Sequence, residues 1–255
     1  MTKIPLALTA GTLALALSAC AGSQPRGPSD RVIARALQSA PGAAQPSTIV
    51  KTEIAYARAA QEQGQYTAAV DFAAAGAQLH GRNGPVSAPA LFAGLPDPQQ
   101  ANEWSPSAVV MSCDGQIALS QGRFVDTEGF VGNYVTAWVR QQDGEYKWIY
   151  DVAGRDDPQP PPRKEFEDGD IVVTAIDSVE GLVATCPRGG ETIPPPPPLS
   201  IGEDISGLAQ LSRDGTLRWR WEHRADGTKY VAAEYYYNGQ WVTAIEELLA
   251  SPAEG

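Results

Sequence analysis

The chain has 255 residues, of which 43% are hydrophobic, and a formal net charge of −11. A surface this acidic repels phosphate backbones, so we expect no nucleic-acid partner. The only histidines, His80 and His223, are far apart in the sequence and have no neighbouring cysteine, so the sequence predicts no metal site and no cofactor. The length beyond the first 30 residues suits one large domain or two small ones.

The N-terminus has the composition of a secretory signal. Lys3 precedes an apolar run from Ile4 to Leu17, and small residues lead to Cys20. This run is shorter than the roughly 20 residues needed to cross a bilayer, so we do not expect it to be a permanent membrane span.

The segment Leu17-Ser18-Ala19-Cys20 resembles the lipobox of bacterial lipoproteins. The resemblance implies a signal peptide at 1–19, lipidation of Cys20 and a lipid anchor in a membrane. Because Ala21 follows the cysteine, it also implies an outer membrane lipoprotein that faces the periplasm. The alternative is an ordinary secretory signal in which the cysteine is incidental. Removal of the leader deletes Lys3 and no acidic residue, which moves the formal charge from −11 to −12.

Helical patterns come first along the chain. Residues 20–46, rich in Gly, Ser and Pro, are predicted to be a flexible tether, with a short helix at 31–39. A helix is predicted from Ser47, as its cap, to Gly64, where it stops; its inner face would carry Val50, Ile54 and Ala57. A second helix is predicted from Tyr66 to Leu79. Residues 81–106 read as a loop with one helical turn at 90–93.

The spacing of the hydrophobic residues then changes from the 3.6-residue period of a helix to the two-residue period of a strand. Strands are predicted at 108–112, 116–124, 133–141 and 146–151, with Asp-Gly turns before the second and fourth. A Pro-rich linker at 157–165 leads to a β segment at 166–251, with strands predicted at 171–176, 182–186, 216–222, 229–237 and 241–245. The sequence therefore predicts an α+β domain at 47–156 followed by a small antiparallel sheet that packs on it.

The two halves share a pattern of turns. Arg213-Asp214-Gly215 in the second half echoes Cys113-Asp114-Gly115 in the first, and later Gly-containing turns follow at similar spacing. A degenerate internal repeat and two independent sets of hairpins with the same turn chemistry both explain the pattern.

The region from Ser47 to Asp151 resembles the nuclear transport factor 2-like family, also called SnoaL-like. The resemblance rests on the two predicted helices, on 112–118, and on the hairpin 132–151, which has aromatic residues on both strands and ends in Asp151. It implies helices packed on a strongly bent antiparallel sheet, a cone with an apolar pocket.

The resemblance suggests which residues line such a pocket, namely Tyr56, Tyr66, Tyr134, Trp138, Trp148 and Asp151. The main interpretation is a non-catalytic scaffold or a binder of a small apolar molecule. One alternative is an isomerase or dehydratase that acts on a small cyclic compound, with Asp71 or Asp151 as base beside a tyrosine. Another is an envelope protein-interaction module, as a homodimer or with another envelope protein, with an exposed aromatic face such as Trp219 and Trp221.

Each candidate also has a structural explanation. Asp151 could cap a turn or pair with Arg140, and the aromatic residues could be core. His80 falls in a predicted Gly-rich loop, so no catalytic residue is assigned. Cys113 and Cys186 could form a disulfide in an oxidising periplasm or remain two separate buried thiols.

Overall fold

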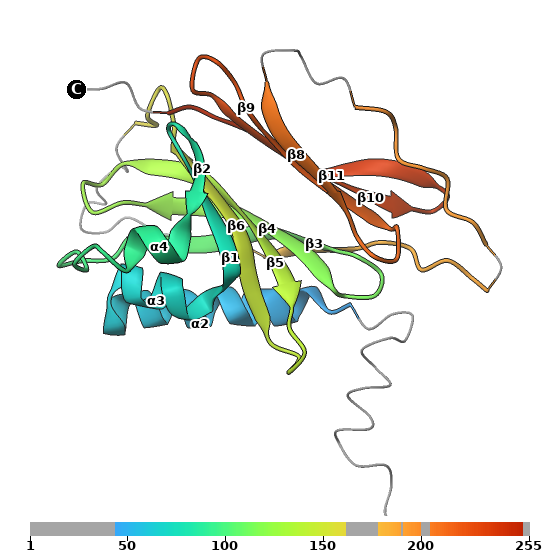
Figure 1. Ribbon diagram of the computed structural model, residues 1–255, viewed down its shortest axis with the longest axis horizontal. Helices are drawn as coiled ribbons and strands as arrows, with labels where there is room; N and C mark the ends of the chain where they lie inside the picture. The colour runs from blue at the N-terminus through green and yellow to red at the C-terminus, as the bar shows by residue number, and fades with distance from the viewer. Residues whose placement is uncertain (1–43, 162–177, 190, 200–204, 252–255) are drawn as a thin grey trace, which may run out of the picture.

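The computed structural model describes residues 44–161, 178–189, 191–199 and 205–251. They form three layers: helices, a seven-stranded mixed sheet and a four-stranded antiparallel sheet (Figure 1). The structure therefore confirms the α+β class. The predicted leader, the Cys20 lipid site, the helix at 31–39 and the strand at 171–176 lie outside the described residues.

The helical layer consists of α2 (Pro46–Gln63), α3 (Gln65–Phe72) and the short α4 (Ala88–Phe92). The predicted Ser47 cap is wrong, because α2 begins one residue earlier, with Pro46 in its first turn and Gln45 at the cap position without a side-chain hydrogen bond. The predicted end at Gly64 is confirmed: its φ of +112° is a conformation that glycine adopts readily.

The predicted second helix is wrong beyond Phe72. The chain becomes extended at Ala73 and forms β1 (Ala73–Gly81), which pairs parallel with β6 (Tyr146–Arg155) and antiparallel with β2 (Gly84–Ser87). Gly76, with a φ of +80°, interrupts the helical run of alanines. Strand pairing thus overrides the high helix propensity of alanine, and His80 lies on a buried strand rather than in a loop.

The larger sheet, sheet A, has the order β2-β1-β6-β5-β4-β3-β7. Its central meander consists of β3 (Glu103–Met111), β4 (Ile117–Val125), β5 (Val131–Arg140) and β6. These strands run antiparallel as predicted, but the β1–β6 and β3–β7 pairs are parallel, so the sheet is mixed. β3 begins within the predicted loop, with a register shift between Pro106 and Ala108 where the proline interrupts the ladder.

The smaller sheet, sheet B, has the order β11-β10-β9-β8. Its strands are β8 (Ser206–Leu211), β9 (Leu217–His223), β10 (Lys229–Tyr237) and β11 (Gln240–Leu249). The predicted strand at 182–186 is β7 (Glu180–Val183), which joins sheet A beside β3 rather than sheet B. The chain therefore crosses back to complete the first sheet before it builds the second.

Alternating side chains of the central strands fill two cores. On β5, Val135 and Ala137 pack towards sheet B, whereas Trp138 packs towards the helices. Trp219 and Trp221 of β9 are buried in the core between the sheets, so they do not form an exposed platform. The predicted packing of the second β segment on the first is confirmed.

The two echoed turns meet in space. In each turn the serine hydroxyl donates to the aspartate two residues later, from Ser112 to Asp114 and from Ser212 to Asp214, both at 2.6 Å. The backbone N–H of Asp114 donates to the Asp214 carboxylate at 2.8 Å. Beside these turns a disulfide joins Cys113 to Cys186 and links the first turn to the segment that follows β7.

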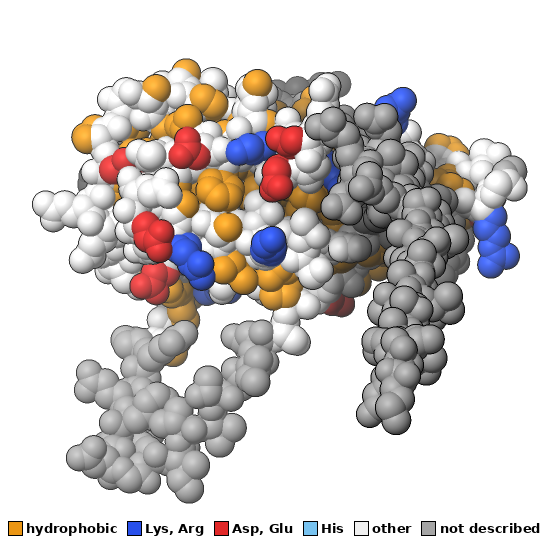
Figure 2. All heavy atoms as spheres, turned by 90° about the horizontal axis from the view of Figure 1, so that it is seen from below, with side chains coloured by type: hydrophobic (Ala, Val, Ile, Leu, Met, Phe, Trp, Pro, Cys, Tyr) orange, Lys and Arg blue, Asp and Glu red, His pale blue; other side chains and the backbone are white. Residues whose placement is uncertain are grey.

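The outer side of the helical layer mixes apolar and charged side chains, as Figure 2 shows from below. Ile54, predicted to face inward, is 53% exposed, because α2 turns Ile49, Glu53 and Ala60 to the sheet instead. Within the described part of the chain, no helix is long and apolar enough to span a membrane.

Candidate functional site

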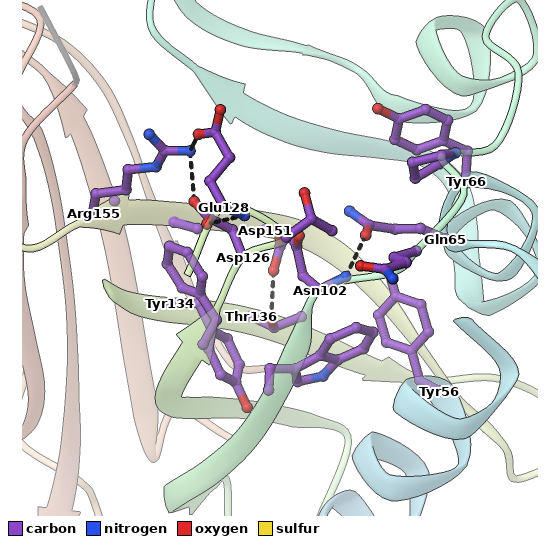
Figure 3. A pocket seen from close by; sticks show the side chains of 17 residues that line it. Tyr56, Gln65, Tyr66, Asn102, Asp126, Glu128, Tyr134, Thr136, Asp151 and Arg155 are labelled. Carbon is purple, nitrogen blue, oxygen red and sulfur yellow. Dashed lines mark hydrogen bonds and ion pairs between the residues drawn. The ribbon is translucent and has the colours of Figure 1, made fainter. Parts of the chain in front are cut away.

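A cavity of about 500 Å³ lies between the helical layer and sheet A. Figure 3 shows Asp151 in the middle, with Arg155 on one side and Tyr56 and Gln65 from the helices on the other. The walls come from α2, α3, the segment 98–104, β4, the β4–β5 loop, β5 and β6. Among the lining residues are Tyr56, Tyr66, Trp104, Phe124, Asp126, Glu128, Tyr134, Thr136, Asp151, Ala153 and Arg155.

A β-bulge turns Asp151 into this cavity. Trp148 pairs with Trp138 but Tyr150 pairs with Ala137, so Ile149 is an extra residue on β6. Because strand side chains alternate, one extra residue exchanges the faces of everything after it on the strand. Trp148 accordingly packs towards the helices and Tyr150 towards sheet B, which leaves Asp151 on the cavity side.

Asp151 is the most unusual polar group of the lining. Its Oδ1 accepts a hydrogen bond of 2.6 Å from the Thr136 hydroxyl on the facing strand, and it makes no ion pair within 4 Å among the described residues. Burial raises the pKa of Asp151 to about 6, although the Thr136 hydrogen bond and the Lys229 ammonium both lower it. The carboxylate is therefore poised to exchange a proton near neutral pH.

Asp151 lies within β6, which continues to Arg155, so it is not at the strand end as predicted. The alternative pairing with Arg140 is also wrong, because the Arg140 Nε donates to the Gly144 carbonyl.

A second buried carboxylate, Glu53 of α2, lies behind the cavity wall and is 1% exposed. Its oxygens accept from Trp104 Nε1 at 3.0 Å and from the Ser120 hydroxyl, which in turn accepts from Trp138 Nε1 at 2.8 Å. Burial raises the pKa of Glu53 to about 7 against the lowering effect of these hydrogen bonds, and the negative charge of Asp151 raises it further.

Glu53 was not predicted from the sequence. The available signal was spacing: Ile49, Glu53, Tyr56 and Ala60 follow i, i+4, i+7 and i+11 on α2.

Aromatic rings surround the carboxylates. Tyr56 packs edge-on against Trp104 with ring centroids 4.9 Å apart, and Tyr66 stacks on Phe92 at 5.0 Å. The Tyr134 hydroxyl is buried and has no hydrogen-bond partner among the described residues. Burial, together with the charges of Asp151 and Glu53, holds the pKa values of Tyr56 and Tyr134 well above the ordinary value, so both stay protonated donors.

The rim of the cavity is ionic. The Arg155 guanidinium pairs with Asp126 at 2.6 Å and with Glu128, and it lies 4.2 Å from the centroid of the Phe130 ring. Beside the lining residues Tyr66 and Pro98, Asp97 accepts from the backbone N–H groups of Tyr66 and Thr67 and so caps α3. These contacts hold Arg155 and the start of α3 in place.

The structure separates the six predicted pocket residues into two groups. Tyr56, Tyr66, Tyr134 and Asp151 line the cavity. Trp138 and Trp148 do not line it: both are fully buried in the core between helices and sheet, where the Trp148 indole donates to the Ala69 carbonyl. Asp71, the other suggested base, is exposed on α3 and does not line the cavity.

His80 belongs to a different polar cluster, between the sheets. Its Nδ1 lies 2.5 Å from the Tyr150 hydroxyl and its Nε2 lies 3.0 Å from His223 Nδ1. Burial and the neighbouring His223 and Lys229 lower the pKa of His80 to about 4, so it is neutral in this environment. Among the described residues, no group of three or more His, Cys, Asp or Glu side chains could hold a metal ion.

Comparison with known proteins gives similarity in structure only. No protein-family model matches the chain, and a search of curated proteins finds no similar sequence. Among solved structures, nuclear transport factor 2 from Cryptosporidium parvum is similar at 13% identity and a TM-score of 0.34, over 44% of this chain and 95% of that one.

Two further solved structures are similar to a comparable extent. A protein from Novosphingobium aromaticivorans, described as an aromatic ring hydroxylase, shares 16% identity at a TM-score of 0.30, over 42% of this chain and 86% of that one. A protein from Exiguobacterium sibiricum, described as a Ca/calmodulin-dependent kinase II association domain, shares 16% identity at a TM-score of 0.32, over 45% and 96%. At these values the similarities carry no conclusion about activity, and the cavity itself is the better guide.

Proposed function

We propose that this chain binds a small organic molecule, with an apolar body and one polar end, in the cavity around Asp151. The observation that carries the proposal is a cavity of about 500 Å³ that is lined by aromatic rings and contains the Asp151 carboxylate, which makes no ion pair among the described residues. The volume falls in the usual range of ligand sites, and an apolar lining with a few convergent polar groups is their usual composition. A scaffold has no need of an unfilled interior, so ligand binding accounts better for this geometry. In this proposal, sheet A, strongly bent, and the helices form a cone around the ligand.

Filling the cavity tests this proposal. Ala153 lines it from β6, so Ala153→Phe places a ring in the space that the ligand would occupy. Native mass spectrometry of the purified soluble chain should detect a ligand in the wild type and none in this variant. Val86→Phe, at an exposed position on β2 away from the cavity, is the matched control and should keep the ligand. No copurifying ligand, together with no binding from a library of small ring compounds, would contradict the proposal.

A second candidate function is proton transfer on a bound cyclic substrate, in an isomerase or dehydratase. It is favoured by the position of Asp151, whose pKa is near neutral, in one cavity with the tyrosines Tyr56 and Tyr134. In this scheme Asp151 removes a proton and a tyrosine hydroxyl stabilises the developing oxyanion. The scheme predicts exchange of an acidic C–H of a bound ketone in deuterated water, lost in Asp151→Asn; binding without exchange would reject it.

We also propose that the molecule works at a membrane surface, attached through lipid on Cys20 and facing the periplasm from the outer membrane. The sequence Leu17-Ser18-Ala19-Cys20 supports this, and several acyl chains hold a protein far more firmly than one. Replacing Cys20 by serine should release the chain from the membrane fraction and remove the mass of the lipid. An unchanged mass and fractionation would reject the anchor.

A further inference from the structure

We infer that the ligand of this cavity is a small organic cation, an ammonium group held by the Asp151 carboxylate and by the faces of the surrounding rings. The inference rests on the proposed binding function and names the chemical class of its ligand. It is drawn from three independent features of the lining: its charge, its aromatic content and the state of its one available cation.

The charge of the lining is unbalanced. The ionisable groups that line the cavity with a formal charge are the carboxylates of Asp126, Glu128 and Asp151 and the guanidinium of Arg155. Behind the wall, Glu53 adds a buried carboxylate and Lys229 a buried ammonium, each close enough to Asp151 for the charges to interact, so the excess of negative charge remains. An anionic ligand would therefore enter a field of its own sign, whereas a cation would neutralise it.

The one cation of the lining is already engaged. Arg155 is held at the rim by Asp126 and Glu128, and its guanidinium also covers the Phe130 ring. Lys229 does not line the cavity; it comes from β10, and its ammonium donates to the Ala153 carbonyl at 2.6 Å. Asp151 is thus left with a hydroxyl, that of Thr136, as its direct partner. The Lys229 ammonium acts on Asp151 without an ion pair within 4 Å, so a cationic ligand would supply the direct partner that this carboxylate lacks among the described residues.

The aromatic residues suit the same ligand. Tyr56, Tyr66, Trp104, Phe124 and Tyr134 all line the cavity. The face of an aromatic ring carries negative potential and attracts cations, and cages of such rings are a known means of binding quaternary ammonium groups. A neutral apolar ligand would also fit against the rings, but it would leave Asp151 unpaired, so the carboxylate and the rings together favour the cation.

The test uses three molecules of one shape that differ in charge. Choline is the cation, 3,3-dimethylbutan-1-ol is its neutral carbon analogue and 3,3-dimethylbutanoate is the anion. Calorimetric titration of the soluble chain without its leader should give roughly tenfold tighter binding of choline than of the alcohol and no binding of the anion. Trp104 lines the cavity, so its fluorescence provides a second signal.

Two variants and one matched control locate the effect. Asp151→Asn keeps the acceptor for Thr136 and removes the charge, so the preference for choline over the alcohol should fall by about tenfold. Asp71→Asn removes the same charge from an exposed position on α3 and should leave the preference unchanged. Phe124→Leu keeps an apolar wall without an aromatic face. It should weaken the binding of choline by several-fold and leave the binding of the alcohol almost unchanged.

The outcomes separate this inference from the proposed function. If the alcohol binds as tightly as choline, or if Asp151→Asn leaves the preference intact, the cation inference is overturned and ligand binding stands. If none of the three molecules binds and no ligand copurifies with the chain, both are overturned.

Discussion

The two four-stranded meanders of this molecule, β3–β6 and β8–β11, are built alike and used differently. Both contain the turn Ser-X-Asp-Gly between their first two strands, and both run antiparallel throughout. The first is covered on both faces, by the helices and by sheet B. The second packs one face on the first sheet, and no helix or sheet of the described residues covers its other face, although Arg218, Glu222, Ala232 and Tyr236 on that face are buried. We infer that sheet B serves to cover one face of sheet A. The cavity can then lie on the other face of sheet A, under the helices.

The carboxylates show the same division. On the outer face of sheet B, Glu234 is paired with Arg218 and Glu222 with Arg220. Inside the first unit, Asp151 and Glu53 have hydrogen bonds but, among the residues that the structure describes, no ion-pair partner. Paired carboxylates hold a sheet together, whereas unpaired ones destabilise the fold and are typical of sites that bind or react. Four predictions test whether the two units differ in this way.

The largest effect is expected in the core that the two sheets share. Trp219 is 2% exposed and its ring centroid lies 5.2 Å from that of Tyr150. Trp219→Ala should lower the free energy of unfolding by about 3–5 kcal/mol because it leaves a large void. Tyr237→Ala, at a position that is 44% exposed, is the control and should change little. Chemical denaturation measures both; two separate transitions in the wild type would mean that the sheets fold independently.

The next effect is expected at the disulfide that joins the first meander to the segment after β7. Replacing Cys113 and Cys186 by serine opens a bridge that spans 73 residues and should lower the free energy of unfolding by about 2–4 kcal/mol. The wild type under reducing conditions should show the same fall in the midpoint of thermal unfolding. A double variant as stable as the oxidised wild type would show that the disulfide does not stabilise the fold.

A smaller effect is expected from the paired carboxylates of sheet B. The Arg218 side chain is 7% exposed and donates to Glu234 at 2.6 Å. Glu234→Ala therefore leaves a buried guanidinium with one remaining partner in the part of the chain that the structure describes, the Pro197 carbonyl. We expect a loss of about 2 kcal/mol, below the full value for a buried pair because Glu234 is partly exposed. Removing both partners, in Arg218→Met with Glu234→Leu, should restore most of it in the same denaturation assay.

The smallest effect should have the opposite sign. The folded chain holds the pKa of Asp151 near 6, above the 3.8 of the unfolded carboxyl, so the folded state binds more protons between these values. Stability from this group is therefore present at low pH and is lost as the pH rises through 6. Asp151→Asn should raise the free energy of unfolding by about 1–2 kcal/mol at pH 8 and by almost nothing at pH 4. Equal effects at both pH values would show that Asp151 is not an unpaired buried charge.

Much of the fold follows from local chemistry that can be read in the sequence. The Asp-Gly turns, the alternation along β5 and the stop at Gly64 are each specified by a few neighbouring residues. The β1 strand is not, because Ala73-Ala74-Ala75 has helical propensity and becomes a strand only through pairing with β6. Tertiary contacts of this kind leave no local pattern.

The site was predictable in part for the same reason. Asp151 stood out as a carboxylate in an aromatic hairpin, but its direction depends on the bulge at Ile149, which no residue preference announces. Trp138 and Trp148 lie on the same face of sheet A as Asp151, but α2 and α3 pack on them, so they belong to the core and do not line the cavity. Glu53 was missed because a charged residue on a helix is usually taken as solvent-facing, whereas here three hydroxyl and indole groups form a buried chain of hydrogen bonds around it.

Because β7 returns to pair with β3, the chain cannot be divided at the Pro-rich linker between its two predicted halves. A fragment that ends at residue 161 would lack β7, expose the backbone of β3 along the sheet edge and leave Cys113 as a free thiol. Open edges and free thiols both promote self-association. Anyone who expresses the helical half alone should therefore expect inclusion bodies, and a shortened version that stays soluble would have to keep residues 178–186 attached.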